Sequence, residues 1–486
     1  MLKKKPKQYS RHINREEGQG SRYWRDIFLF IVSVLLIIAL ADVLKISPAV
    51  VLLLIALFYY VKLQRSFSAQ KKYSLLHIGL LFVIFLAVSD TVVKSTLPVF
   101  YLPFSIIPML AAILFFNLEI PLLLSVASAI TLMLLVKNNL YLGLIALISG
   151  IISSFLVIGA RRRSQIIRAG FFVGLVQMVC LFFIEAFKVS RPEAYTVLFM
   201  NGFTCGVAVA GILPIFEYLF KVITNISLLE LSDFNHPLLR LMILKAPGTY
   251  HHSLVVGNLA EQACEAVAGA NSLLARVGAY YHDIGKIEKA EYFSENQNLD
   301  LSKHDELAPS MSKLVIINHV KEGVELARKY RLNPKIIDFI QQHHGTSIVY
   351  YFYRRALESA EQEQQVEEVR EEGFRYFGPR PGSKETAIVL LADSVEAACR
   401  SVRTPTHSKV EEMVRKIINN KFIDGQLDEC DLTLRDLEKI ASVFVRILDS
   451  IYHARVTYPE KESENSNTKS PKENSRQLEE TKEAGP

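Results

Sequence analysis

Long apolar runs fill the first 220 residues and constrain the fold more than any other feature of the sequence. Most of these runs are about 17–22 residues long, the length that a helix needs to cross about 30 Å of hydrocarbon. Eight runs can be counted, at residues 27–44, 48–63, 76–96, 97–116, 118–136, 140–160, 170–187 and 196–220. They explain the hydrophobic fraction of 50% and the mean hydropathy of +0.22. The sequence therefore predicts a transmembrane helix bundle over residues 26–220, preceded by a basic cytoplasmic segment at residues 1–25.

The basic residues between the runs are unevenly distributed. If the N-terminus is cytoplasmic, the inner segments carry sixteen Lys and Arg residues and the outer segments carry five. Positively charged loops favour the cytoplasmic side, and an even number of spans returns the chain to that side. The first run is long and lacks a small-residue cleavage site, so we expect a membrane helix and not a signal peptide. The net charge of +6 thus reflects topology, and no polymeric nucleic acid is expected as a partner.

The pattern changes after Phe220 to amphipathic segments separated by Gly and Pro, with little period-2 alternation. We expect an all-α cytoplasmic domain at residues 221–458 and a disordered polar tail at residues 459–486. The helices of the cytoplasmic domain are expected at residues 228–244, 250–268, 272–283, 308–330, 334–344, 354–372, 384–402, 408–420 and 432–453. The stretch at 358–372 is rich in Glu and Gln, which fits either a solvated surface helix or an insertion over a site.

Histidines are concentrated in one part of this second half. Seven of the twelve lie between His251 and His344, far more than that segment's share of the chain. Three of them belong to the pairs His282 with Asp283 and His343 with His344, and each pair is followed closely by a glycine. Imidazoles mixed with carboxylates are typical ligands of iron, manganese or zinc. The five cysteines form no CxxC pair, so a thiolate zinc site is not indicated.

Several motifs carry a specific resemblance. The run YYHDIGK at residues 280–286 resembles the defining motif of the HD phosphohydrolase superfamily, an all-α metal-dependent fold. The flanking motifs resemble those of membrane-anchored cyclic di-AMP phosphodiesterases of the PgpH, or seven-transmembrane HD, type. These motifs are GTYHHS (248–253), LLARVGAYYHDIGK (273–286), HHGT (343–346), FRYFGPRP (374–381), KETAIVLLADSVEAA (384–398) and GQLDECDLT (425–433). Relatives usually carry a large extracytoplasmic domain after the first span, whereas only residues 45–47 separate the first two runs here.

The resemblance implies two divalent metal ions, manganese or iron, that share Asp283 as a bridging ligand. One ion would bind His252, His282, Asp283 and Asp393, and the other would bind Asp283, His319, His343 and His344. His252 is preferred to His251 because it stands directly before Ser253 in the motif.

Four basic residues are candidates for substrate contact. Lys286 could touch a phosphate oxygen, acting in catalysis with Asp283, or it could be a solvent-facing residue at a helix end. The other three, Arg375, Arg380 and Lys384, are either phosphate contacts or ordinary surface charges.

The resemblance thus implies a multi-pass protein of the cell membrane that hydrolyses cyclic di-AMP to linear pApA through a hydroxide activated by two metals. Its expected partners are a cyclic dinucleotide, the lipid bilayer and, in a homodimer, a second copy of the chain. Three alternatives stay open: a cyclic di-GMP phosphodiesterase, an enzyme acting on another nucleotide, and a membrane receptor whose HD domain only binds nucleotide. The Gly-Tyr-Pro signature of cyclic di-GMP enzymes is replaced by Gly345, Thr346 and Ser347.

Overall fold

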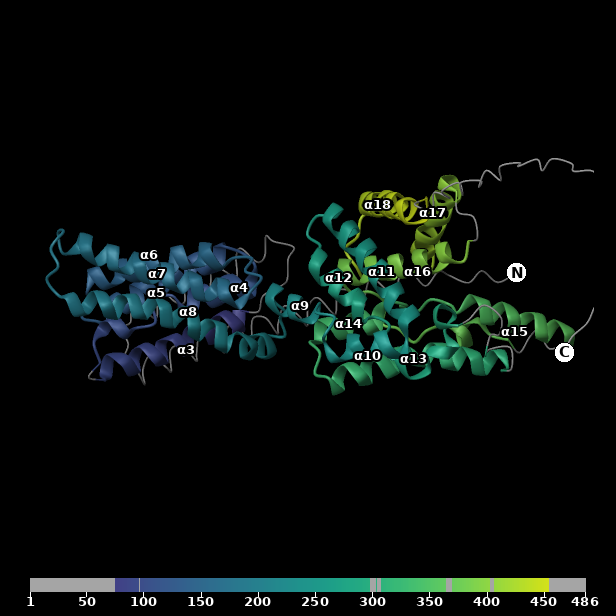
Figure 1. The fold of residues 1–486 in the computed structure, drawn as a ribbon, viewed down its shortest axis with the longest axis horizontal. Coiled ribbons are helices and arrows are strands. Elements are labelled where there is room, and N and C mark those ends of the chain that lie inside the picture. Colours follow the sequence, from purple (N-terminus) through teal and green to yellow (C-terminus); the bar gives the residue numbers. More distant parts are fainter. Residues whose placement is uncertain are drawn as a thin grey trace, which may run out of the picture.

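A computed structural model describes residues 75–95, 97–297, 303, 307–363, 369–402 and 406–453. Over these residues the chain forms helices and no strand, which confirms the expected all-α class. Figure 1 shows two helical bundles, one built from α3–α8 and the other from α10–α18, with the short helix α9 between them. The runs at 27–44 and 48–63, the basic segment 1–25 and the tail 459–486 lie outside the described residues.

The first bundle contains the remaining apolar runs. Its helices are α3 (Leu75–Lys94), α4 (Ile106–Phe115), α5 (Glu119–Leu135), α6 (Leu140–Val157), α7 (Arg163–Ile184) and α8 (Pro192–Phe220). Four of them, α3, α6, α7 and α8, are long and apolar enough to cross a membrane. Short loops join consecutive helices from α4 to α8, so these neighbours run antiparallel.

One predicted run is not a continuous helix. Residues 97–116 form the 3-10 turn η1 (Val99–Tyr101) and then the shorter α4, so the prediction of a single helix there is wrong. Pro103 explains the break, because a proline disfavours helical geometry at the residue before it, and Leu102 has ψ of 138°. Asn201 of α8 donates from Nδ2 to the carbonyls of Phe100 at 3.0 Å and Leu102 at 2.6 Å. Irregular backbone at membrane depth needs such partners inside the protein.

Glycines allow α7 and α8 to pack backbone against backbone. Gly170 and Gly174 of α7 face Gly202 and Gly206 of α8, and each pair has GxxxG spacing. A Cβ built on Gly202 would lie 2.2 Å from the nitrogen of Gly174. Small residues at this spacing are typical of close helix contacts in membranes.

The second bundle surrounds the motif residues. Its α-helices are α10 (Pro237–Lys245), α11 (Pro247–Ala266), α12 (Ser272–Tyr281), α13 (Pro309–Lys329), α14 (Pro334–Gln342), α15 (Tyr350–Glu363), α16 (Lys384–Arg400), α17 (His407–Ile423) and α18 (Leu434–His453). Two shorter 3-10 helices matter for the site, η2 (Ile284–Tyr292) and η5 (Glu371–Phe374). Two of the predicted helices differ. The segment expected to be one helix at 228–244 is divided into α9 and α10 by a turn that precedes Pro237. The segment expected to be one helix at 354–372 contains the end of α15 and the start of η5.

The helix α9 (Asn225–Leu231) is bonded to both bundles. Glu230 accepts from Arg163 of α7 at 2.9 and 3.1 Å, and the next residue, Leu231, accepts at 2.7 Å from the hydroxyl of Tyr281. Tyr281 is fully buried and directly precedes His282. The junction therefore ties the first bundle to the helix that carries the HD motif.

Candidate metal centre

Two helix ends and the interiors of three further helices bring seven predicted ligands together. His282 and His343 each cap the C-terminus of a helix, α12 and α14, and Asp283 and His344 follow them directly. Interior positions of α11, α13 and α16 supply His252, His319 and Asp393, which are the remaining three. Six of the seven are buried and His344 is partly buried. His251, the alternative to His252, is exposed.

Close backbone contact between η2 and α13 places Asp283 beside His319. A Cβ on Gly285 would lie 1.8 Å from the carbonyl oxygen of His319 and 2.5 Å from the nitrogen of Gly323. Only glycine fits at such a distance, since real Cβ contacts are never that short. Gly285 of the HDIGK motif therefore has a packing role in building the site.

The two carboxylate oxygens of Asp283 face different groups of ligands. Oδ2 lies 3.2 Å from Nε2 of His282 and 3.7 Å from Nε2 of His252. Oδ1 lies 3.4 Å from Nε2 of both His319 and His343. Asp393 adds Oδ1 at 3.0 Å from His252 Nε2, and its Oδ2 is 3.5 Å from His344 Nδ1. This is the placement that a carboxylate bridging two ions requires.

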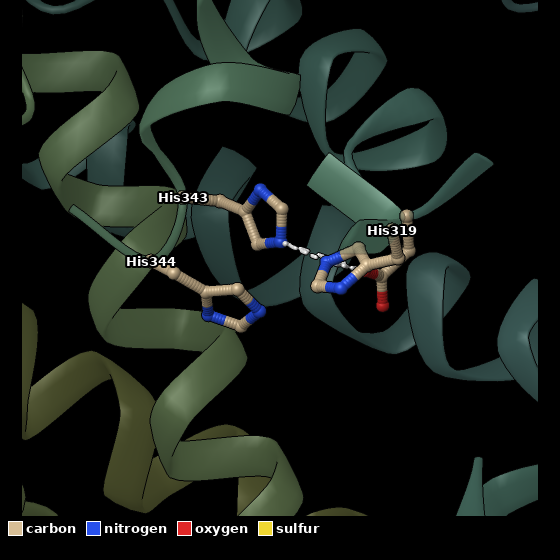
Figure 2. Close-up of side chains that lie close together, drawn as sticks. His319, His343 and His344 are labelled. Carbon is tan, nitrogen blue, oxygen red and sulfur yellow. Dashed lines mark hydrogen bonds and ion pairs between the residues drawn. The ribbon is translucent and has the colours of Figure 1, made fainter. Parts of the chain in front are cut away.

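Hydrogen bonds on the outer side of the rings aim the inner nitrogens at the centre. His282 donates from Nδ1 to the carbonyl of Ala279 at 2.6 Å, and His343 donates to Ile340 at 3.0 Å. His319 bonds likewise to Ile316, three residues earlier. Figure 2 shows the rings of His319 and His343 directed at each other, with Nε2 atoms 3.2 Å apart and His344 beside them. An imidazole held in this way presents the lone pair of Nε2 to a metal.

His252 differs because a carboxylate orients it. Its Nδ1 contacts Oε2 of Glu396, which is buried on α16 one turn after Asp393. Such carboxylate–histidine pairs fix the ring and strengthen it as a ligand. Glu396 was not among the residues predicted from the sequence. The signal that could have found it is its spacing, because residues i and i+3 share a helix face.

The pKa shifts differ between the ligands around His282 and those around His343. Burial alone would lower the pKa of His282, but Asp283 and Asp393 raise it to about 10. Burial opposes the charge on Asp283 as well, yet His282 and Lys286 hold its pKa well below the usual range. In the second half, burial lowers the pKa of His343 to about 4 and that of His344 well below its usual value. His343 and His344 are therefore neutral at physiological pH, as ligands must be.

The donor set fits two divalent ions. Nε2 of His282 and Oδ1 of Asp283 are buried and have no hydrogen-bond partner among the described residues, which is costly unless something else binds them. His252, His282, Asp283 and Asp393 form one group whose ligand atoms lie within 4.8 Å of one another, and Asp283, His319, His343 and His344 form another. Mixed nitrogen and oxygen donors favour a transition metal over magnesium.

A pocket of about 570 Å³ opens beside this centre. Its lining includes the ligands His252, His319, His344 and Asp393, the aromatic rings of Tyr292, Phe293, Tyr351, Phe352 and Tyr376, and the charged residues Lys286, Glu295 and Arg400. A second pocket of about 370 Å³ shares His344 and Tyr376 with the first. Tyr376 stacks on His344 with the ring centroids 4.2 Å apart. The centre is therefore open to a ligand that has aromatic parts.

Lys286 is fixed within the site and does not face solvent. Its side chain is 12% exposed, and Nζ lies 2.6 Å from Oδ2 of Asp283 and 2.9 Å from Oε1 of Glu295. The alternative of a solvent-facing lysine is therefore wrong. Its contact with a phosphate stays a prediction.

The other three predicted substrate contacts lie elsewhere. Arg375 pairs with Asp424 at 2.9 Å and donates to the carbonyl of Thr346 at 2.9 Å. Arg380 pairs with Asp428, and Lys384 donates to the carbonyl of Ala268. None of the three lines the pocket beside the ligands. Asp424 and Asp428, which are distant in the sequence, pair with the two arginines, and a phosphate contact stays a prediction for all three residues.

Fold and site define a membrane protein with a metal-binding HD domain, and comparisons with known families agree. Residues 40–224 match the family described as 7TM receptor with intracellular HD hydrolase, and residues 249–398 match the HD domain. The chain belongs to the membrane-anchored HD-domain proteins, and the expected resemblance to the PgpH type is confirmed.

Two curated relatives are named cyclic-di-AMP phosphodiesterase PgpH. The one from Bacillus subtilis is 46% identical over 330 residues, which cover 66% of this chain and 45% of that protein. The one from Listeria monocytogenes is 38% identical over 417 residues, covering 83% of this chain and 57% of the relative. The chain thus spans about half the length of these relatives. A crystal structure of the L. monocytogenes PgpH HD domain in complex with cyclic-di-AMP is 46% identical, with 46% of this chain and 100% of that chain covered and a TM-score of 0.43.

Proposed function

We propose that this protein is a membrane-bound phosphodiesterase that hydrolyses cyclic di-AMP to linear pApA, with its HD domain in the cytoplasm. The observation that carries the proposal is the position of Asp283, whose two oxygens face two separate groups of histidine ligands. The names of the two relatives support the substrate. The family description, with its intracellular HD hydrolase, and the charge asymmetry of the loops support the orientation.

The seven ligands would hold two manganese or iron ions. When bound, such a pair supplies an activated water and neutralises charge on a phosphate during in-line displacement. The chain itself contributes orientation. The carbonyls of Ala279 and Ile340 fix the rings of His282 and His343, and Lys286 holds Asp283 in place.

The pocket also fits the substrate class. It places aromatic side chains next to the ligands, and stacking of a base on an aromatic ring stabilises binding by about 1–3 kcal/mol. Tyr376 is a neutral phenol at physiological pH, and burial raises its pKa further, so it adds no negative charge beside a base. The homodimer and the domain boundaries remain predictions.

The test uses the purified full chain in detergent with manganese or iron. We expect cyclic di-AMP to be opened to pApA, and cyclic di-GMP to react with a much lower kcat/KM. Asp283→Asn, which keeps the size of the side chain, serves as the inactive control. Equal turnover of the two nucleotides would reject the adenine preference, and tight binding without any product would favour the receptor alternative.

A further inference from the structure

Two basic side chains line the pocket beside the ligands, Lys286 and Arg400, and only one of them is fully engaged. Lys286 lies within 2.9 Å of two carboxylates. The nearest carboxylate oxygens of the described residues lie 3.7 Å from Arg400, on Glu396, and 3.8 Å from it, on Glu295. Both distances exceed those of charge-assisted hydrogen bonds. The side chain of Arg400 is 35% exposed, so its guanidinium can reach a ligand.

The position of Arg400 on α16 sets its distance from the centre. Asp393, Glu396 and Arg400 stand at i, i+3 and i+7, which places them on one face of the helix. Seven residues correspond to about 10.5 Å along a helix axis. The backbone of Arg400 is therefore about two turns beyond Asp393, and its guanidinium, 3.7 Å from Glu396, lines the same pocket as the ligands.

A cyclic dinucleotide has two phosphates on opposite sides of its ring, and only one can lie on the metal ligands during cleavage. The other would enter a pocket that contains the carboxylate of Glu295 and adjoins Glu396, both buried and repulsive to an anion. A guanidinium suits this task because its planar N–H groups match phosphate oxygens. We propose that Arg400 binds the phosphate that is not cleaved and so selects two-phosphate rings over simple diesters. This inference rests on the proposed function.

A purely structural role makes a different prediction. If Arg400 served only to neutralise Glu295 and Glu396, its loss would disturb His252 through Glu396 and would impair every substrate alike. The two roles can be separated with a diester that has one phosphate, because such a compound occupies the metal ligands and leaves the second position empty.

The experiment compares cyclic di-AMP with bis(4-nitrophenyl) phosphate on the full chain in detergent. For Arg400→Gln we expect KM for cyclic di-AMP to rise about tenfold or more, which corresponds to the ~1.4 kcal/mol of a charge-assisted hydrogen bond. KM for the one-phosphate ester and the bound metal should stay within about twofold of the wild type, a change worth under ~0.5 kcal/mol. Arg400→Lys should recover part of the loss, and Arg446→Gln, an exposed arginine on α18, is the matched control.

Equal losses on both substrates, or loss of metal from Arg400→Gln, would overturn the inference and assign Arg400 a structural role. Unchanged KM values for both substrates would also overturn it. A wild type that cleaves the one-phosphate ester but not cyclic di-AMP would instead contradict the proposed function itself, and the inference with it.

Discussion

The site depends on residues whose contacts cross the fold: Asp283 reaches two groups of ligands, and Glu396 of α16 orients His252 of α11. The sequence indicated all seven side chains that the structure gathers, and it favoured buried His252 over exposed His251. It did not indicate Glu396, Glu295 or Arg400, since their roles depend on contacts between distant segments. Nor did it indicate that Asp424 and Asp428, which are remote in the sequence, pair with Arg375 and Arg380.

Replacing Asp283 by alanine should remove both metal ions and nearly all activity, because each of its oxygens faces a different group of ligands. Elemental analysis of the purified variant measures the loss directly. His251→Ala is the control, and its exposed ring predicts near-normal metal content. Full metal occupancy with normal turnover in Asp283→Ala would contradict the assignment.

Glu396→Gln should weaken metal binding although Glu396 is not itself a predicted metal ligand. The amide keeps the size of the side chain but loses the charge that holds Nδ1 of His252, and loss of such a partner typically costs about 10–100-fold in metal affinity. Titration of the metal-free protein with manganese gives the affinity. Glu412→Gln, at an exposed position of α17, is the control, and equal affinities for the two variants would rule out the positioning role.

Metal uptake should release protons and strengthen as the pH rises. In the metal-free site the pKa of His282 is raised to about 10, so its ring carries a proton at pH 7–8 and must lose it before Nε2 can bind an ion. Affinity should therefore increase with pH from about 7 toward that pKa, until the ring is neutral. Calorimetry in two buffers with different ionisation enthalpies counts the protons, and heats independent of the buffer would contradict the expectation.

At the scale of elements, periodicity and length predicted most helices but not their interruptions. The expected helix at 97–116 failed because Pro103 breaks it and Asn201, a hundred residues away, makes the break tolerable. The 3-10 segment η2 has no periodic pattern in the sequence. It forms where Gly285, which has no side chain, allows the backbone to pack directly against α13. Such features depend on tertiary contacts that a single sequence does not display.

The glycine contact between α7 and α8 can be tested with a matched pair on one helix. Gly202→Ala places a methyl group where Gly174 leaves no room, so we expect destabilisation of about 1–3 kcal/mol, as for other overpacked sites. Gly211→Ala on the same helix meets nothing within 4 Å and should be neutral or slightly stabilising. Thermal unfolding of the detergent-solubilised protein compares them, and equal melting temperatures would refute close packing at Gly202.

At the scale of the whole molecule, the structure and the family match both concern how the protein is oriented in the membrane. Seven of the eight predicted runs begin and end within residues 40–224, the segment that matches a family described by seven spans and an intracellular hydrolase. In Figure 1 helix α9 and the HD domain lie at one end of the first bundle. Arg163, which pairs with Glu230 of α9, starts helix α7 at that same end. The loops before α6 and α8 lie one helix length away, because the helices alternate in direction.

We therefore predict that Lys137 and Arg191 face the outside and that Arg162 faces the cytoplasm. The physical reason is the sixteen-to-five bias of basic residues, and the proposed action of the HD domain on an intracellular nucleotide requires the same orientation. Single cysteines are introduced at these positions after the five native cysteines are replaced, and intact cells are treated with a membrane-impermeant maleimide. Cysteine at positions 137 and 191 should be labelled in intact cells, whereas cysteine at 162 should react only after the membrane is permeabilised. The reverse pattern would invert the topology and place the HD domain outside the cell, where the proposed substrate would not reach it.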